Sequence, residues 1–150
     1  MDESEIPLLD MVIRLLAAVG LAFALGLERE LRGKPAGLRS HMLVSLGACA
    51  FIMMGMHILL ATAEGDPSAS IDPTRIVEGV VGGIGFLGAG CIIQSRGNVQ
   101  GITTGASIWI AGAIGVACGL GTVVLAGLLT GFALITVIVL GHFEREVIED

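Results

Sequence analysis

Residues 82–109 read GGIGFLGAGCIIQSRGNVQGITTGASIW, a glycine-rich apolar segment followed by a short polar turn and a pair of threonines. Five glycines fall between Gly82 and Gly90. In a water-soluble helix each of them would cost about 1 kcal/mol relative to alanine. A bilayer changes this balance, because lipid cannot satisfy backbone polar groups and small residues let a neighbouring helix approach closely. The stretch therefore predicts helices that pack inside a membrane.

The whole chain has the composition of a multi-pass membrane protein. Of its 150 residues, 54% are hydrophobic and 15% are charged, and the formal net charge is −6. The basic residues are too few to follow a phosphate backbone, so we expect no nucleic-acid partner. The three cysteines lie in apolar runs without metal-ligand spacing and predict packing roles. We expect one membrane domain over residues 1–141 and a short cytoplasmic tail over 142–150.

Five apolar runs approach the length of about 20 residues that a membrane span requires. They lie at 8–27, 42–62, 76–93, 102–118 and 122–140. The last two are divided at residues 119–121, because one helix of their combined length would be roughly twice as long as the hydrocarbon core is thick. The sequence therefore predicts an all-α integral membrane protein with five transmembrane helices.

The basic residues predict the orientation of these spans. They gather in the segment 28–41, in the turn between spans three and four, and in the tail. With five spans, all three segments lie on one side, and the acidic N-terminus lies on the other. The positive-inside rule then places the N-terminus outside and the C-terminus in the cytoplasm.

A shift of 64 residues matches one part of the chain to another. It lays Gly26 on Gly90, Arg32 on Arg96, Gly37 on Gly101 and Ser40 on Thr104. Spans one and two thus resemble spans three and four, which predicts a parallel repeat of a two-helix hairpin followed by a fifth helix. The alternative is a chance agreement of glycine and arginine near membrane turns.

Arg14 lies about two turns inside the first span, where an ionisable residue is costly and suggests a function. The same shift places it on Glu78, so the two could form an intramembrane polar pair between the repeats. Asp10, one turn earlier on the same helix face, is the competing partner. In a third interpretation Arg14 reaches the lipid headgroups and Glu78 caps a helix start.

The segment ERELRGKPAGLRSH at 28–41 is the densest polar stretch and predicts a cytoplasmic docking loop. Its proline and glycine favour a turn. Mixed charges on a rigid turn suit a specific protein partner. The candidate contact residues are Glu28, Arg29, Arg32, Lys34 and Arg39. The alternative role is topology control together with binding to anionic lipid.

Four glycines recur at helical spacing in the third span and predict tight helix packing, within the chain or in a homo-oligomer. They are Gly79, Gly82, Gly85 and Gly88. Alternatively, they allow a break in the helix that exposes backbone groups to an ion. At the start of span four, we expect the hydroxyls of Thr103 and Thr104 to cap the helix. An anion site at that terminus is the alternative.

The acidic residues of the outer loop are weak metal-ligand candidates. Asp66 and Asp72 could offer hard oxygen ligands to Mg²⁺. The sequence shows no nucleophile beside a base, no spaced metal-ligand cluster and no phosphate loop. We therefore expect a protein that is not an enzyme and has no cofactor.

Four strings carry a resemblance to a known family. GLERELRGKPAGLRSHMLVSLGA, DPTRI, GIGFLGAGCI and GITTGASIW resemble, in order, the signature segments of the MgtC/SapB family of bacterial inner-membrane proteins. Ser40 stands where the family usually has threonine, and Ile102 and Gly105 replace its leucine and alanine. Some members carry a soluble C-terminal domain, and this chain is expected to be a short form without it.

The resemblance implies a role in growth under magnesium limitation and, in pathogens, in survival inside macrophages. It further implies action on a membrane partner such as F-type ATP synthase, with the lipid bilayer as surroundings. Our first hypothesis is thus a non-enzymatic membrane regulator. The alternatives are a Mg²⁺ or other cation transporter or channel that uses Glu78, Arg14 and a broken third span, and a structural membrane subunit.

Overall fold

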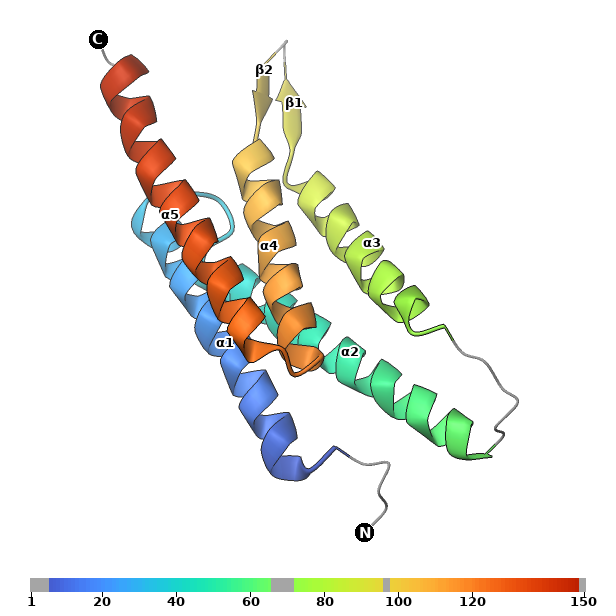
Figure 1. Ribbon diagram of the computed structural model, residues 1–150. Helices are drawn as coiled ribbons and strands as arrows, with labels where there is room; N and C mark the ends of the chain where they lie inside the picture. The colour runs from blue at the N-terminus through green and yellow to red at the C-terminus, as the bar shows by residue number, and fades with distance from the viewer. Residues whose placement is uncertain (1–5, 66–71, 96–97, 149–150) are drawn as a thin grey trace.

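The computed structural model describes residues 6–65, 72–95 and 98–148. Within them the chain forms five helices and one two-stranded hairpin (Figure 1). The elements are α1 (Leu8–Leu31), α2 (Leu38–Gly65), α3 (Thr74–Gly90), β1 (Ile93–Ser95), β2 (Asn98–Gln100), α4 (Ile102–Gly119) and α5 (Val123–Ile148). The fold is thus helical, as the sequence predicts.

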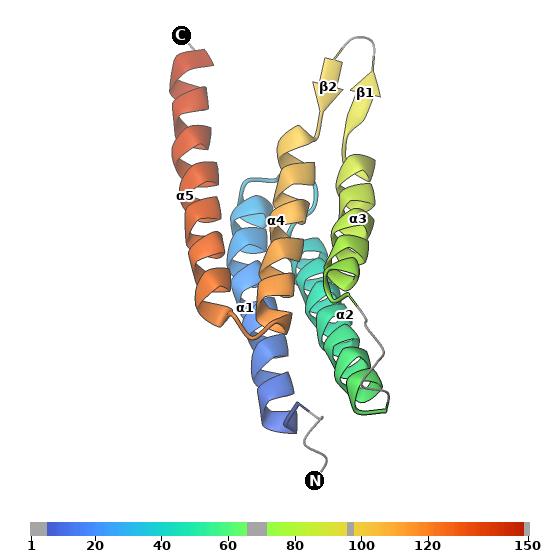
Figure 2. The ribbon, with the colours of Figure 1, turned by 45° about the vertical axis from the view of Figure 1, so that its right-hand side comes forward.

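Helix α4 is the centre of the bundle and contacts each of the other four helices. Figure 2 shows α3 and α5 on opposite sides of it, with α1 and α2 behind. Small residues make this position possible. A Cβ on Gly119 would lie 2.8 Å from the carbonyl oxygen of Cys49, and one on Gly115 would collide with the carbonyl of Ser45. Glycine at these positions lets the α2 and α4 backbones touch.

The core lies where α1 and α2 pack against α4. The largest fully buried side chains of the bundle include Leu25 of α1, Ile52 and Cys49 of α2, and Ile114 and Cys118 of α4. The three cysteines are free thiols, and Cys49 and Cys118 are buried. Many large apolar side chains are exposed on the outer faces of the helices. Such a surface suits lipid rather than water.

The connections between helices lie alternately at the two ends of the molecule (Figure 1). The turn between α1 and α2, the β1–β2 hairpin and the C-terminal end of α5 point the same way, and α1 begins at the opposite end (Figure 1). The helices therefore alternate in direction along the chain. The membrane orientation predicted from the basic residues requires this arrangement but stays a prediction.

Several boundaries differ from the sequence prediction. Helix α5, for example, continues to Ile148, and two other differences change the predicted docking loop. Helix α1 continues to Leu31 because nothing in residues 28–31 breaks a helix, and it ends before Gly33, whose φ is +61°. Helix α2 already begins at Leu38. The predicted loop at 28–41 therefore shrinks to a short turn, and Glu28, Arg29 and Arg39 belong to helices.

The third predicted span has the least support as a membrane crossing among the five. Helix α3 is the shortest of the five, with 17 residues, at the lower limit of the length that can cross the hydrocarbon core. Four helical segments of the described chain are long and apolar enough to do so, namely Leu8–Leu31, Leu38–Thr62, Ile102–Gly119 and Val123–His142. The fifth pass and the parallel repeat thus stay predictions. The sequence analysis also missed the hairpin, in which Ile93 pairs with Gln100 and Gln94 with Val99.

Candidate functional site: two arginines at the ends of helix α4

Two arginines of α1 reach the two ends of α4. Arg14 donates from Nη1 to the carbonyl oxygen of Gly119, at 2.7 Å. Arg29 donates from Nη2 to Oγ1 of Thr104, at 3.0 Å. The two arginines are separated by as many residues as the two acceptors, so the contacts fix an antiparallel register between α1 and α4 over their shared length.

The Arg14 end is electrostatically balanced. Nη2 of Arg14 lies 2.7 Å from Oδ2 of Asp10, one turn earlier on the same helix. Its other contact, with Gly119, is at the C-terminus of α4, where the helix dipole is negative and favours a cation. The chain then reverses at Gly121, whose φ is +80° and where an added Cβ would lie 3.1 Å from Cζ of Arg14. Glycine at this turn therefore lets the guanidinium sit close against the backbone.

The Arg29 end is not balanced. Arg29 is only 3% exposed. Its Nε has no hydrogen-bond partner in the described part of the chain, which is true of Nε of Arg14 as well. The neighbouring carboxylate, Glu28, pairs instead with Nε of Arg32, at 2.6 Å. Helix α4 begins here, so the positive end of its dipole lies on the same side as the guanidinium. Arg29 therefore meets a neutral hydroxyl at a positively polarised helix end.

Glu28 and Arg32 lie beside Arg29, and Arg32 links this end of α1 to α5. Oε2 of Glu28 has no partner among the described residues, although the carboxylate is buried. Arg32 also reaches the carbonyl oxygen of Val137 on α5, at 3.5 Å. The group formed by Glu28, Arg29 and Arg32 thus carries one net positive charge, because its one carboxylate neutralises only one of its two guanidinium groups.

A buried histidine joins α2 to the same end of α4. Nδ1 of His41 lies 2.8 Å from the carbonyl oxygen of Gly37, and Nε2 lies 3.1 Å from Oγ of Ser107. Ser107 in turn donates to the carbonyl oxygen of Thr104, at 2.8 Å. Since the Gly37 carbonyl can only accept, Nδ1 carries a proton. These bonds lock the first turns of α2 and α4 together.

The sequence analysis missed His41, Ser45 and Ser107, although their spacing carried a signal. His41 and Ser45 are four residues apart and lie on one face of α2. Ser45 donates to the carbonyl oxygen of Ala18 on α1, at 3.0 Å. All three are fully or almost fully buried. Polar residues at helical spacing inside an apolar run therefore marked the inner face of α2.

The structure brings together only some of the predicted site residues. Arg14 pairs with Asp10, whereas Glu78 is exposed on α3 and no ion pair between Glu78 and Arg14 occurs in the described part of the chain. Of the candidate docking residues, only Lys34 and Arg39 are exposed at the surface. Glu28 and Arg29 face inward because α1 stays helical and turns them toward α4. Only part of the predicted docking loop is therefore at the surface, and its docking role stays a prediction.

The predicted packing glycines of α3 differ in how closely other atoms approach them. A Cβ on Gly88 would lie 3.1 Å from the carbonyl oxygen of Gly105, so α3 and α4 touch there. At Gly79, Gly82 and Gly85 an added Cβ would meet no atom within 4 Å. Most of the glycine stripe therefore faces away from the bundle.

The remaining candidates lie at helix starts. Helix α4 has no side-chain cap: its N-cap is Gly101, with φ of +89°, so neither Thr103 nor Thr104 caps it as expected. Oδ1 of Asp72 accepts from the amide and the hydroxyl of Thr74, which lowers the pKa of Asp72. Asp66 lies outside the described residues. Within those residues no group of three His, Cys, Asp or Glu side chains could hold a metal.

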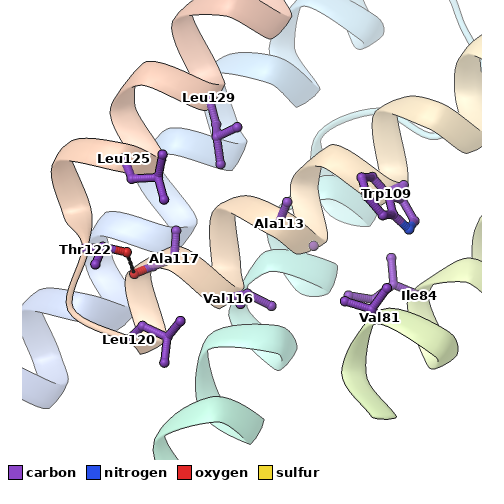
Figure 3. A pocket seen from close by; sticks show the side chains of 11 residues that line it. Val81, Ile84, Trp109, Ala113, Val116, Ala117, Leu120, Thr122, Leu125 and Leu129 are labelled. Carbon is purple, nitrogen blue, oxygen red and sulfur yellow. Dashed lines mark hydrogen bonds between the residues drawn. The ribbon is translucent and has the colours of Figure 1, made fainter. Parts of the chain in front are cut away.

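An apolar groove of about 240 Å³ runs between α3, α4 and α5 (Figure 3). Val81 and Ile84 form one wall, Leu125 and Leu129 form the other, and Trp109 lies along it. The hydroxyl of Thr122 donates to the carbonyl of Ala117 and is not free for a ligand. The groove thus offers an apolar surface and no polar chemistry.

Four apolar helices long enough to cross a bilayer define a multi-pass membrane protein, in which two arginines hold α1 and α4 in register. A family model described as MgtC matches residues 15–146. The chain therefore belongs to the MgtC family.

Curated relatives agree with this assignment. The chain is 40% identical over 112 residues to the Escherichia coli K12 protein named "Putative magnesium transporter YhiD", covering 75% of this chain and 52% of that one. It is 41% identical over 119 residues to protein MgtC of Salmonella typhimurium LT2, covering 79% and 47%. It is 41% identical over 149 residues to protein SrpB of Synechococcus elongatus, covering 91% and 76%.

The chain thus spans about half the length of YhiD and MgtC. No solved structure matches it.

Proposed function

We propose that this protein is a non-enzymatic protein of the bacterial inner membrane that supports growth when magnesium is scarce, and that it acts by contact with another membrane protein. Membership of the MgtC family supports the magnesium link. In this proposal the N-terminus lies outside and the C-terminus in the cytoplasm, as the basic residues predict. A membrane subunit of F-type ATP synthase is the first partner to test, because the family resemblance implies it.

One observation supports contact through α3: its glycine face is uncovered. The added-Cβ positions at Gly79, Gly82 and Gly85 meet no atom of the chain within 4 Å, whereas those on α4 collide with neighbours. In Figure 2, α3 stands at the edge of the bundle. A helix face without side chains allows another helix to approach closely in lipid. This face replaces the docking loop as the proposed contact surface.

A substitution on that face tests the proposal. Gly82→Leu should leave the fold intact, because the side chain enters open space, but should block close approach of a partner helix. The matched control is Gly20→Leu on α1, since Gly20 is also exposed and meets nothing within 4 Å. Growth at low Mg²⁺ and recovery of ATP synthase subunits after cross-linking in cells are the measurements.

The two variants separate the outcomes. Loss of growth and of recovery with Gly82→Leu, but not with Gly20→Leu, supports the proposal. If cross-linking instead recovers a second copy of the chain and Gly82→Leu abolishes it, the face serves a homo-oligomer. Equal behaviour of both variants would refute a role for α3.

A second candidate function is transport of Mg²⁺ or another cation. It is favoured by the buried carboxylate of Glu28, whose Oε2 has no partner among the described residues, and by the name of the relative YhiD. Uptake of Mg²⁺ by proteoliposomes that contain the pure protein, lost in Glu28→Gln and kept in Glu78→Gln, would support it. Absence of uptake and of any recovered partner would favour a structural membrane subunit.

A further inference from the structure

We propose that Arg29 and the N-terminus of α4 form a binding site for a phosphate-type oxyanion, supplied either by an anionic lipid headgroup or by free phosphate. Such a ligand would balance the excess positive charge at this end of α4. The site is independent of the proposed contact surface on α3, which lies on another helix.

The two ends of α4 differ in their charge balance. At the C-terminus, Arg14 has a carboxylate partner and a negatively polarised helix end. At the N-terminus, the described residues place no carboxylate within 4 Å of Arg29, and the end of α4 itself is positively polarised. The nearest negative polarity comes from backbone carbonyls at the C-terminal end of α3, which lie against Gly101 and Gly105. Because an unpaired buried charge is costly, an anion is the missing component.

Several hydrogen-bond donors gather at this end of α4. Gly101 caps the helix without a side chain, and the first helical backbone bond runs from Gly105 to Gly101. The amides of residues 102–104 therefore have no carbonyl four residues earlier within the helix. The Thr104 hydroxyl accepts from Arg29, and its own proton has no acceptor in the described chain. Nε of Arg29 also lacks a partner among these residues.

The exposure of the first residues of α4 also supports an oxyanion as the ligand. Ile102 is 60% exposed, and Thr103 beside it is also exposed. The first turn of α4 is therefore open to the surface at Ile102 and Thr103, and Arg29 is buried beside Thr104 in the same turn. This end of α4 lies at the end of the bundle that carries the β1–β2 hairpin (Figure 1). The ends of membrane-spanning helices meet lipid headgroups.

The start of α2 offers a comparison, because the predicted repeat lays it on the start of α4. There the Oε2 atom of Glu30 accepts from the amide of Leu38, at 3.0 Å, so the chain supplies its own anion. The shift of 64 residues that lays Leu38 on Ile102 lays Glu30 on Gln94, which is neutral. Helix α4 thus lacks the carboxylate that α2 possesses, and an external oxyanion would take its place.

Binding can be measured as thermal stabilisation of the purified chain in a phosphate-free maltoside detergent. The probes are dioleoylphosphatidylglycerol, with dioleoylglycerol as its headgroup-free control, and inorganic phosphate, with chloride as its control. A rise in Tm with the phospholipid alone identifies a lipid headgroup as the ligand. A rise with inorganic phosphate as well identifies a site open to the free ion. No rise with either probe overturns the proposal.

Two sets of variants test whether the site is the one named. Arg29→Gln should weaken binding roughly tenfold or more, because a charge-assisted hydrogen bond is lost. Arg75→Gln, at an exposed position at the start of α3, should leave the affinity unchanged. Equal affinities of these two variants would place the ligand elsewhere.

The second set keeps the test valid if Arg29→Gln does not fold. Thr103→Asp places a carboxylate beside the free amides. It should raise Tm without any probe and abolish the probe-dependent rise. Thr103→Asn should keep that rise. If Thr103→Asp responds to the probes as strongly as Thr103→Asn does, the N-terminus of α4 is not the site.

Discussion

The closest helix contact in the bundle makes a quantitative prediction. Gly115→Ala puts a methyl group against the carbonyl of Ser45 and 2.9 Å from Cβ of Ala48. The obstacle is backbone, which cannot rotate away, so α2 and α4 must separate. Overpacking of this kind costs about 1–3 kcal/mol, and a rigid carbonyl places it at the upper end. Removing a helical glycine returns up to about 1 kcal/mol. The net expected loss of stability is therefore roughly 1–2 kcal/mol.

The assay is equilibrium unfolding in mixed micelles, with increasing dodecyl sulfate and helix content as the signal. The matched control is Gly127→Ala on α5, where an added Cβ meets no atom within 4 Å. This variant gains the helix preference of alanine without a clash, so its free energy of unfolding should equal or exceed that of the wild type. If Gly115→Ala proves as stable as Gly127→Ala, α2 and α4 do not pack backbone to backbone.

Other contacts of the bundle lead to three more predictions. Arg14→Met removes the charged hydrogen bond to Gly119, which should cost about 1.5–3 kcal/mol of unfolding free energy in the same assay; an unchanged value would show that this contact does not hold α1 to α4. Ser45→Ala should cost about 1 kcal/mol, because the Ala18 carbonyl loses its side-chain donor. Its control is Thr136→Ala, at an exposed hydroxyl on α5, and equal losses in the two variants would contradict the assignment. The contact of Asp72 with Thr74 holds the pKa of Asp72 below its ordinary value, so this stabilisation is present at neutral pH and disappears as the pH falls through the lowered value. Hydrogen exchange at the start of α3, corrected for intrinsic rates, should show this loss in the wild type and not in Asp72→Asn.

The sequence allowed the helices to be predicted because each is an apolar run of nearly bilayer length. The break between the last two helices, at residues 119–121, could also be predicted, since a single helix through that point would be too long for the membrane. The hairpin could not be predicted, because strands of three residues leave too little pattern to separate them from a turn. The end of α1 was misjudged because charged residues were taken as the end of a span, although glutamate and arginine favour helix.

The candidate site was only partly predictable. Arg14 was recognised, and Asp10 was one of its two predicted partners, because both follow from spacing within one helix. The contact between Arg29 and Thr104 joins residues far apart in the sequence, so no local pattern could reveal it. The same holds for His41 and Ser107. A contact between helices depends on how they rotate about their axes, and the sequence of one helix does not determine that rotation.

The glycines distinguish a tightly packed helix, α4, from a helix with an uncovered face, α3. Helix α4 holds three glycines that touch neighbouring backbones, at Gly105, Gly115 and Gly119, whereas most of the predicted packing stripe of α3 meets no other atom. The arginines of α1 hold both ends of that same helix. Helix α4 therefore has little freedom to move, whereas α3 offers a bare face to the membrane. A regulator that binds a partner helix needs both properties: a rigid frame keeps the contact surface in place, and an uncovered face lets the partner approach without first displacing the protein's own side chains.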